Sequence, residues 1–232
     1  MKFLTFDESR DFPYYNHNPR ISKSAWFVLL FCVMISFLFY GVIGGFSEFV
    51  GSIFFCFTML IPLLYYSNWD YSLFLRKPTK NEIILAVLMF MGYMVYAIVL
   101  GDILDYFALS GVSNPDLSIN LESVVSLVFA MMGEELVKFI PLMFFMRFVY
   151  KFTSNRKLAI IVSSVIVLIG FGLIHYDYPN NTIYSIFLLQ GLGTVFELYG
   201  YLKTKNIFVP YISHILTDAT IYILLLSGLV PA

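Results

Sequence analysis

The sequence predicts an all-α integral membrane protein, a polytopic bundle of about seven transmembrane helices with its N-terminus in the cytoplasm. Hydrophobic residues make up 59% of the 232 positions and charged residues only 12%, whereas a soluble domain carries roughly 25% charged residues. The mean hydropathy is +0.82. Seven stretches have the length and apolar composition that a spanning helix needs, about 20 residues each.

The chain divides into two segments. Residues 1–24 are predicted to form a polar tail or interfacial segment, and residues 25–232 the transmembrane domain. The tail has charges close to its start and no early apolar core, so we expect no cleaved signal peptide and an uncleaved first span. The seven predicted spans are residues 25–43, 49–67, 83–101, 121–148, 158–176, 182–202 and 206–228.

Each predicted span is separated from the next by a turn-forming or polar link. Gly44-Gly45 ends the first span, a basic loop follows the second, and an acidic loop follows the third. A second basic link follows the fourth span, Pro179-Asn180-Asn181 follows the fifth, and a third basic link joins the last two. These Gly and Pro-Asn signals are typical of turns between helices.

The basic residues predict the orientation, because cytoplasmic loops close to span ends are enriched in Lys and Arg. In a seven-span model with the N-terminus inside and the C-terminus outside, every basic residue except Lys138 falls on the cytoplasmic side. These residues are Lys2, Arg10, Arg20, Lys23, Arg76, Lys77, Lys80, Arg147, Lys151, Arg156, Lys157, Lys203 and Lys205.

Charge and cysteine content exclude several classes. The net charge is −1, which gives no electrostatic reason to expect nucleic acid as a partner. Cys32 and Cys56 both lie in apolar runs, so neither a disulfide framework nor a cysteine zinc site is expected. The scarcity of cysteine and the lack of a targeting segment fit a prokaryotic plasma membrane.

A cluster of charges interrupts the fourth predicted span, where Glu134, Glu135 and Lys138 lie in an apolar run. A charge at mid-membrane costs about 2.5–3.5 kcal/mol on insertion scales, so such residues indicate a functional site. Residues four apart share a helix face, so we expect Glu134 to pair with Lys138. Glu135 projects about 100° away and can address another partner.

Two histidines lie in or at later spans. His175 ends the fifth span, and His214 lies in the seventh, four residues before Asp218. That spacing places His214 and Asp218 on one helix face, where the carboxylate can orient the imidazole or, if protonated, donate a hydrogen bond.

The order of these motifs resembles that of the CAAX protease and bacteriocin-processing family of intramembrane glutamic proteases, which includes the type II CAAX prenyl endopeptidases. The resemblance covers about residues 130–220. The motifs are Glu134-Glu135, Phe171-x-x-x-His175, the segment from Gly191 through Tyr199 to Ile207, and Pro210-x-x-x-His214-x-x-x-Asp218.

The resemblance implies an intramembrane endopeptidase in which Glu134 and His175 hold and deprotonate a water, while His214 and Asp218 stabilise the oxyanion. Glu135 would be a supporting acid, and no cofactor is implied. The implied partners are the lipid bilayer and a membrane-associated or prenylated protein or peptide substrate. Phe139 stands where the family usually has an arginine, and Lys138 beside it resembles the Glu-Glu-x-x-Lys pattern of related proteases that cut anti-sigma factors.

Other interpretations of the same residues remain open. Histidine and carboxylate are ordinary zinc ligands, so a divalent metal such as zinc is an alternative, although the chain has no His-Glu-x-x-His motif. Glu134–Lys138 and His214–Asp218 can also be separate structural pairs. A non-catalytic scaffold or bacteriocin-immunity protein of the same fold is the rival function. Transport is disfavoured because no span shows paired Gly or Pro breaks in its middle.

Overall fold

The computed structural model describes residues 11–16, 19–110, 120–177, 180 and 182–227. Half of the predicted tail, residues 111–119 of the predicted acidic loop, and Pro179 and Asn181 of the predicted turn lie outside these ranges. Within them every regular element is helical, which confirms the all-α prediction. The elements are α1 (Lys23–Gly44), α2 (Glu48–Tyr66), η2 (Tyr71–Leu73), α3 (Lys80–Tyr106), α4 (Leu121–Thr153), α5 (Arg156–Ile174), α6 (Ile183–Ser185), η3 (Ile186–Gly191), η4 (Leu192–Thr194), α7 (Val195–Thr204) and α8 (Phe208–Leu226).

Six helical segments among the described residues are long and apolar enough to cross a membrane: α1, α2, α3, α5, the run from α6 to α7, and α8. The seventh long helix is α4, which has 33 residues and carries the three interior charges of the sequence. The prediction of about seven membrane helices is therefore confirmed. The chain is an integral membrane protein.

The starts of these helices follow from the sequence. At each start a Ser, Thr or Asn side chain accepts a hydrogen bond from a backbone N–H of the first turn, which satisfies a donor that the helix itself leaves unpaired. The capping residues are Ser22, Ser47, Thr79, Asn120, Asn155 and Thr182. The helix α8 follows a tight link after α7 and begins without such a cap.

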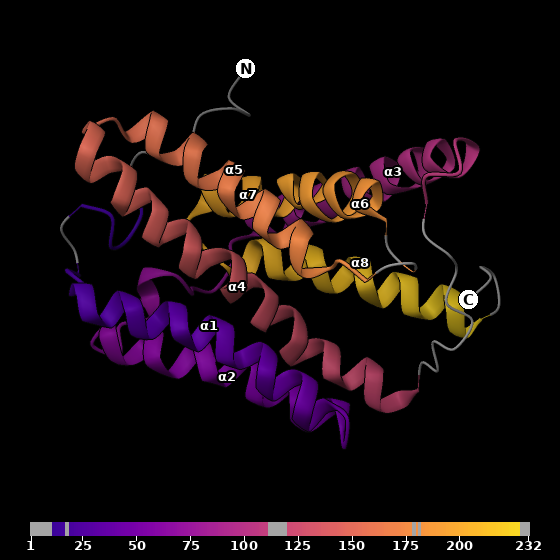
Figure 1. Cartoon of the computed structure of the whole chain (residues 1–232), viewed down its shortest axis with the longest axis horizontal. Coiled ribbons are helices and arrows are strands. Elements are labelled where there is room, and N and C mark those ends of the chain that lie inside the picture. Colours follow the sequence, from indigo (N-terminus) through magenta and orange to yellow (C-terminus); the bar gives the residue numbers. More distant parts are fainter. Residues whose placement is uncertain (1–10, 17–18, 111–119, 178–179, 181, 228–232) are drawn as a thin grey trace.

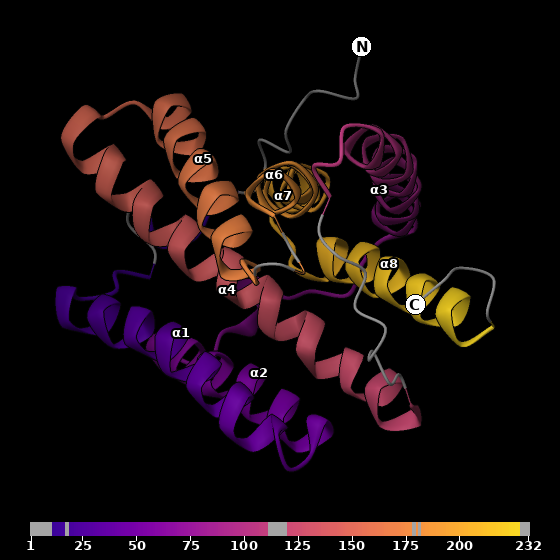
Figure 2. The same ribbon diagram turned by 45° about the vertical axis from the view of Figure 1, so that its right-hand side comes forward.

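The helix α4 crosses the centre of the bundle (Figures 1 and 2). The hairpin of α1 and α2 packs on one side of it, α5 packs along another, and α8 contacts it from the side of α3 and α7. The middle of α4, residues 130–143, is mostly buried, whereas α1 exposes large apolar side chains such as Phe27 and Met34. An apolar exposed surface suits helices that face lipid, and the buried α4 can hold charges that lipid would not accept.

The basic links of the sequence gather at one end of the bundle. Asn206, between α7 and α8, accepts from the backbone N–H of Arg76 and donates to its carbonyl oxygen, both at 3.1 Å. Arg156, at the start of α5, donates to Asp11 of the N-terminal segment at 2.8 Å. Lys205 lies over the ring of Phe12. The links therefore share one end, as the charge pattern predicts, and the cytoplasmic identity of that end stays a prediction.

The N-terminal segment packs into this end. Phe12, Tyr14 and Tyr15 are buried in the main hydrophobic core. The hydroxyl of Tyr14 lies 2.7 Å from the hydroxyl of Ser67 at the end of α2. The aromatic residues before the first span thus close the basic end of the bundle.

The sixth span is not one continuous α-helix. It opens with one turn of α6, continues through the π-helical turn η3 and the 3₁₀ turn η4, and becomes regular in α7. The absence of paired Gly or Pro breaks from the sequence did not predict this change of helix type within the span. The break lies where α5 crosses: a Cβ on Gly172 would lie 2.6 Å from the carbonyl oxygen of Ile186 and 3.2 Å from the Cα of Gly191. This glycine contact brings the end of α5 against the sixth span.

Candidate active site

The helix α4 directs its two adjacent glutamates to different places. The side chain of Glu134 is 22% exposed, whereas that of Glu135 is 4% exposed. Neighbouring residues project about 100° apart on a helix, so one carboxylate reaches an open cavity while the other points into the protein. Glu134 is therefore the acid that a water or a substrate can reach.

A cavity of about 430 Å³ lies between α3, α4, α5, the sixth span and α8. Four of the predicted site residues line it, namely Glu134, His175, His214 and Asp218. The remaining lining residues are Tyr93, Phe171, Gln190, Thr194, Glu197, Thr217, Ile221 and Tyr222. Acids and imidazoles that are up to 84 positions apart in the sequence thus meet in one space.

His214 is the centre of the charged groups. Its Nδ1 lies 2.8 Å from Oε1 of Glu135, and its Nε2 lies 3.6 Å from Oε2 of Glu134. Asp218, one turn further along α8, has its Oδ2 at 3.9 Å from Nε2. Because Glu135 is acceptor-only when ionised, Nδ1 donates to it, and Nε2 is the nitrogen left to face the cavity.

His175 occupies the C-terminal cap of α5. Its Nδ1 lies 2.8 Å from the carbonyl oxygen of Phe171, one turn back along the helix. Its ring packs on the ring of Phe171, with centroids 4.8 Å apart. The backbone contact fixes Nδ1 as the donor, so Nε2 is the nitrogen able to accept a hydrogen bond.

Lys138 does not pair with Glu134, so that prediction is wrong. Its ammonium lies 2.5 Å from Oε1 of Glu135 and also donates to Glu197 of α7. The ring of Phe171 lies 4.6 Å from the ammonium. Positions three and four apart both share a helix face, and here the second carboxylate on α7 draws the lysine toward the buried side of α4.

Glu197 belongs to this cluster, although the sequence motifs do not include it. Its side chain is 11% exposed, it lines the cavity, and one of its oxygens lies 3.8 Å from Nδ1 of His214. The signal that could have found it is the same one that singles out Glu134: a carboxylate within an apolar span indicates a functional residue.

Three of these groups could also offer ligands to a metal ion. Glu135, Glu197 and His214 each present one ligand atom, and these atoms lie within 4.8 Å of one another. However, the ammonium of Lys138 already contacts both carboxylates. A metal ion bound by these three residues would have to displace that ammonium.

Comparison with known proteins gives one family match. No curated protein and no solved structure matches the chain. Residues 117–220 match the family model described as type II CAAX prenyl endopeptidase Rce1-like. The matched range holds all the residues of the charged cluster, from Glu134 on α4 to Asp218 on α8. The motif-bearing part of this integral membrane protein is therefore similar to the Rce1-like family of type II CAAX prenyl endopeptidases.

Proposed function

We propose that the chain is an intramembrane endopeptidase that hydrolyses a peptide bond with a water activated by Glu134. The observation that carries this proposal is the single cavity lined by Glu134, His175, His214 and Asp218. The family match supports protease chemistry at these motifs. The cavity supplies a partly exposed base beside two imidazoles and a second acid.

In the first step Glu134 acts as the general base. Its carboxylate takes a proton from a water that His175 helps to hold through Nε2, and the water oxygen forms a bond to the carbonyl carbon of the substrate. The carbonyl π electrons move to its oxygen, which becomes an oxyanion. Glu134 then gives the proton to the leaving nitrogen as the C–N bond breaks, so one carboxyl serves as base and acid.

His214 stabilises the oxyanion. Its Nδ1–H is engaged by Glu135 at 2.8 Å, so a second proton on Nε2 makes an imidazolium that can donate into the cavity. Carboxylates of Glu134, Glu135, Glu197 and Asp218 all have an oxygen within 4 Å of the ring nitrogens. A preorganised donor of this kind is worth roughly 10²–10³ in kcat in proteases.

Asp218 orients this donor. An ionised aspartate cannot donate to an oxyanion, and its Oδ2 lies 3.9 Å from Nε2 of His214. We therefore assign it the role of drawing the ring toward the cavity. A protonated Asp218 would donate to the oxyanion itself.

The proposed substrate is a membrane-associated protein or peptide, with or without a prenyl group. The catalytic groups lie among helices that are long and apolar enough to cross a bilayer, so a substrate would be reached from the membrane. We place the protein in a prokaryotic plasma membrane. No metal is required in this scheme, because the ammonium of Lys138 already serves as the cation for Glu135 and Glu197.

The test is cleavage of a panel of prenylated and transmembrane peptides by the purified protein in liposomes. Wild type is compared with Glu134→Gln and His214→Ala, each with and without a chelator. Asp105→Asn is the matched control, since it removes an exposed carboxylate of α3 away from the cavity. We expect cleavage by wild type and the control, and a loss of at least about 10²-fold in both site variants.

The alternatives give different results. Cleavage that Glu134→Gln leaves intact rules out the proposed base. Cleavage that a chelator abolishes places a metal at the acids and His214. If wild type cleaves no peptide while Glu134→Gln and His214→Ala retain the protein's biological effect in cells, the protein is a scaffold or immunity protein of this fold.

A further inference from the structure

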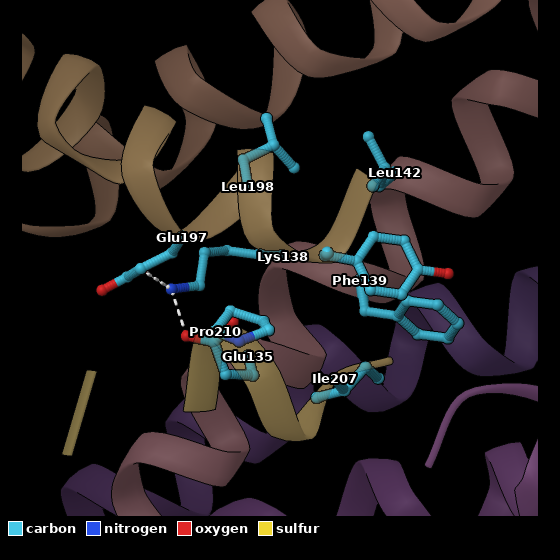
Figure 3. A pocket seen from close by; sticks show the side chains of 9 residues that line it. Glu135, Lys138, Phe139, Leu142, Glu197, Leu198, Ile207 and Pro210 are labelled. Atoms are coloured by element: carbon cyan, nitrogen blue, oxygen red, sulfur yellow. Dashed lines mark hydrogen bonds and ion pairs between the residues drawn. The ribbon is translucent and has the colours of Figure 1, made fainter. Parts of the chain in front are cut away.

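Glu197 of α7 contacts charged or ionisable side chains of two other helices, α4 and α8. It is the third residue of α7, the regular part of the sixth span, and is buried between α4 and α8. Figure 3 shows its carboxylate reaching the ammonium of Lys138, which also reaches Glu135. The mechanism above counts Glu197 only among the carboxylates near His214, and the sequence motifs do not include it.

The contacts form a continuous chain of charges. Glu197 binds Lys138, Lys138 binds Glu135, and Glu135 binds Nδ1 of His214. A lysine ammonium has three donors and no acceptor, so it can hold both carboxylates at once. The side chain of Lys138 is only 4% exposed, so water contributes little to its solvation and these carboxylates must balance its charge.

Glu135 has two positively charged or protonated partners, the ammonium of Lys138 and the imidazole of His214, which share its carboxylate. Its Oε1 is 2.5 Å from the ammonium of Lys138 and 2.8 Å from Nδ1 of His214. While Glu197 shares the ammonium, Glu135 keeps negative charge for His214. Without Glu197, Glu135 would be the one carboxylate that pairs with Lys138 among the described residues. The lysine charge would then be less balanced, close to an imidazole that must itself become positively charged.

The direction of Glu197 depends on the break in the sixth span. A π-helical turn contains an extra residue, so the residues after it are rotated relative to those of a continuous α-helix. The turn η3 precedes Glu197. The close contact of Gly172 in α5 with η3 fixes the position of η3. The break therefore turns a carboxylate of the sixth span toward α4.

We propose that Glu197 is a positioning residue: by sharing Lys138 it keeps Glu135 on Nδ1 of His214 and holds that imidazole in its doubly protonated form. The proposal rests on the proposed function, in which this imidazolium stabilises the oxyanion. The ionisable groups that face His214 or line the cavity with it are Glu134, Glu135 and Lys138 on α4, His175 after α5, Glu197 on α7, Asp218 and Tyr222 on α8, and Tyr93 on α3.

The test measures kcat and KM against pH for the full-length protein in liposomes. Negative charge near an imidazolium stabilises its proton. Glu197→Gln removes one such charge and leaves Lys138 uncompensated, so we expect the alkaline limb of kcat to move to lower pH by about one unit or more. We expect Glu197→Asp, which keeps the charge, to move it back toward wild type.

A second variant separates positioning from simple ion-pair loss. Lys138→Met combined with Glu197→Gln removes one charge of each sign, so we expect its alkaline limb to lie closer to wild type than that of Glu197→Gln alone. Glu82→Gln is the matched control, because Glu82 is also buried and ion-paired, with Arg76 at 2.6 Å, at the basic end of the bundle. We expect it to leave the limb unchanged.

The outcomes are distinct. If Glu197→Gln lowers kcat or thermal stability but its pH profile superimposes on that of wild type, Glu197 is only structural and the proposal fails. Titration of the His214 ring nitrogens by ¹⁵N NMR in wild type and Glu197→Gln gives a readout that needs no cleavage. A titration that moves to lower pH in Glu197→Gln supports the positioning role even if no peptide is cut, and an unchanged titration overturns it.

Discussion

Nδ1 of His214 lies 2.8 Å from Oε1 of Glu135, and 79 positions separate the two residues in the sequence. This contact joins the central helix α4 to α8. It fixes which nitrogen of the imidazole faces the cavity, since a carboxylate accepts from Nδ1–H and leaves Nε2 toward Glu134. The second glutamate of the adjacent pair therefore contacts the histidine, and in the proposed mechanism it does not act on the water.

Glu135→Gln tests this division of roles. The amide oxygen can still accept from Nδ1, but the negative charge that stabilises an imidazolium is gone. We expect kcat for peptide cleavage to fall about 10²-fold with a small change in KM. Steady-state kinetics in liposomes measures both constants. A KM that rises while kcat holds would show instead that Glu135 contributes to substrate binding.

Lys138→Met tests the buried charge balance. The variant leaves Glu135 and Glu197 facing each other without their cation, and breaking a buried ion pair from one side costs about 3–5 kcal/mol. Denaturant unfolding in detergent micelles measures the loss. Lys157→Met, which removes an exposed lysine at the start of α5, is the matched control and is expected to unfold like wild type.

A triple variant completes that test. Lys138→Met with Glu135→Gln and Glu197→Gln replaces all three charges with neutral groups of similar size, so we expect it to regain much of the stability lost in Lys138→Met. No regain would mean that the lysine stabilises the bundle by packing of its stem, for example on Phe171, and not through its charge.

The sequence predicts the helices and the residues that line the cavity better than it predicts which charged side chains form ion pairs. Apolar length and helix caps indicate the spans, and the ordered acids and histidines indicate which residues to compare. The partner of Lys138 could not be predicted, because Glu134 and Glu135 both lie within one turn of it and the choice depends on Glu197. The direction of Glu197 depends in turn on a π-helical turn, which a pattern with a fixed helical period does not reveal.

The glycine contact between α5 and the sixth span gives a stability prediction. In Gly172→Ala the new Cβ would lie 2.6 Å from the carbonyl oxygen of Ile186, so α5 and η3 must move apart. We expect a loss of about 1–3 kcal/mol in unfolding free energy and a lower kcat, because His175 follows α5. Gly170→Ala is the matched control, since a Cβ there has no atom within 4 Å, and it should be neutral or slightly stabilising.

Gln190 gives a prediction about substrate binding that rests on the proposed function. It lines the cavity from the π-helical turn η3, and its side-chain amide has no hydrogen-bond partner among the described residues. A carboxamide can both donate to a peptide carbonyl and accept from a peptide N–H. Losing one such hydrogen bond, worth about 0.5–1.5 kcal/mol, should raise KM about 2- to 10-fold in Gln190→Ala while kcat stays within about twofold.

Steady-state kinetics with a cleaved peptide measures both constants for Gln190→Ala, with Asp105→Asn as the control. A fall in kcat at unchanged KM would instead place Gln190 beside the reacting atoms, where its amide would act on the transition state and not on the bound peptide.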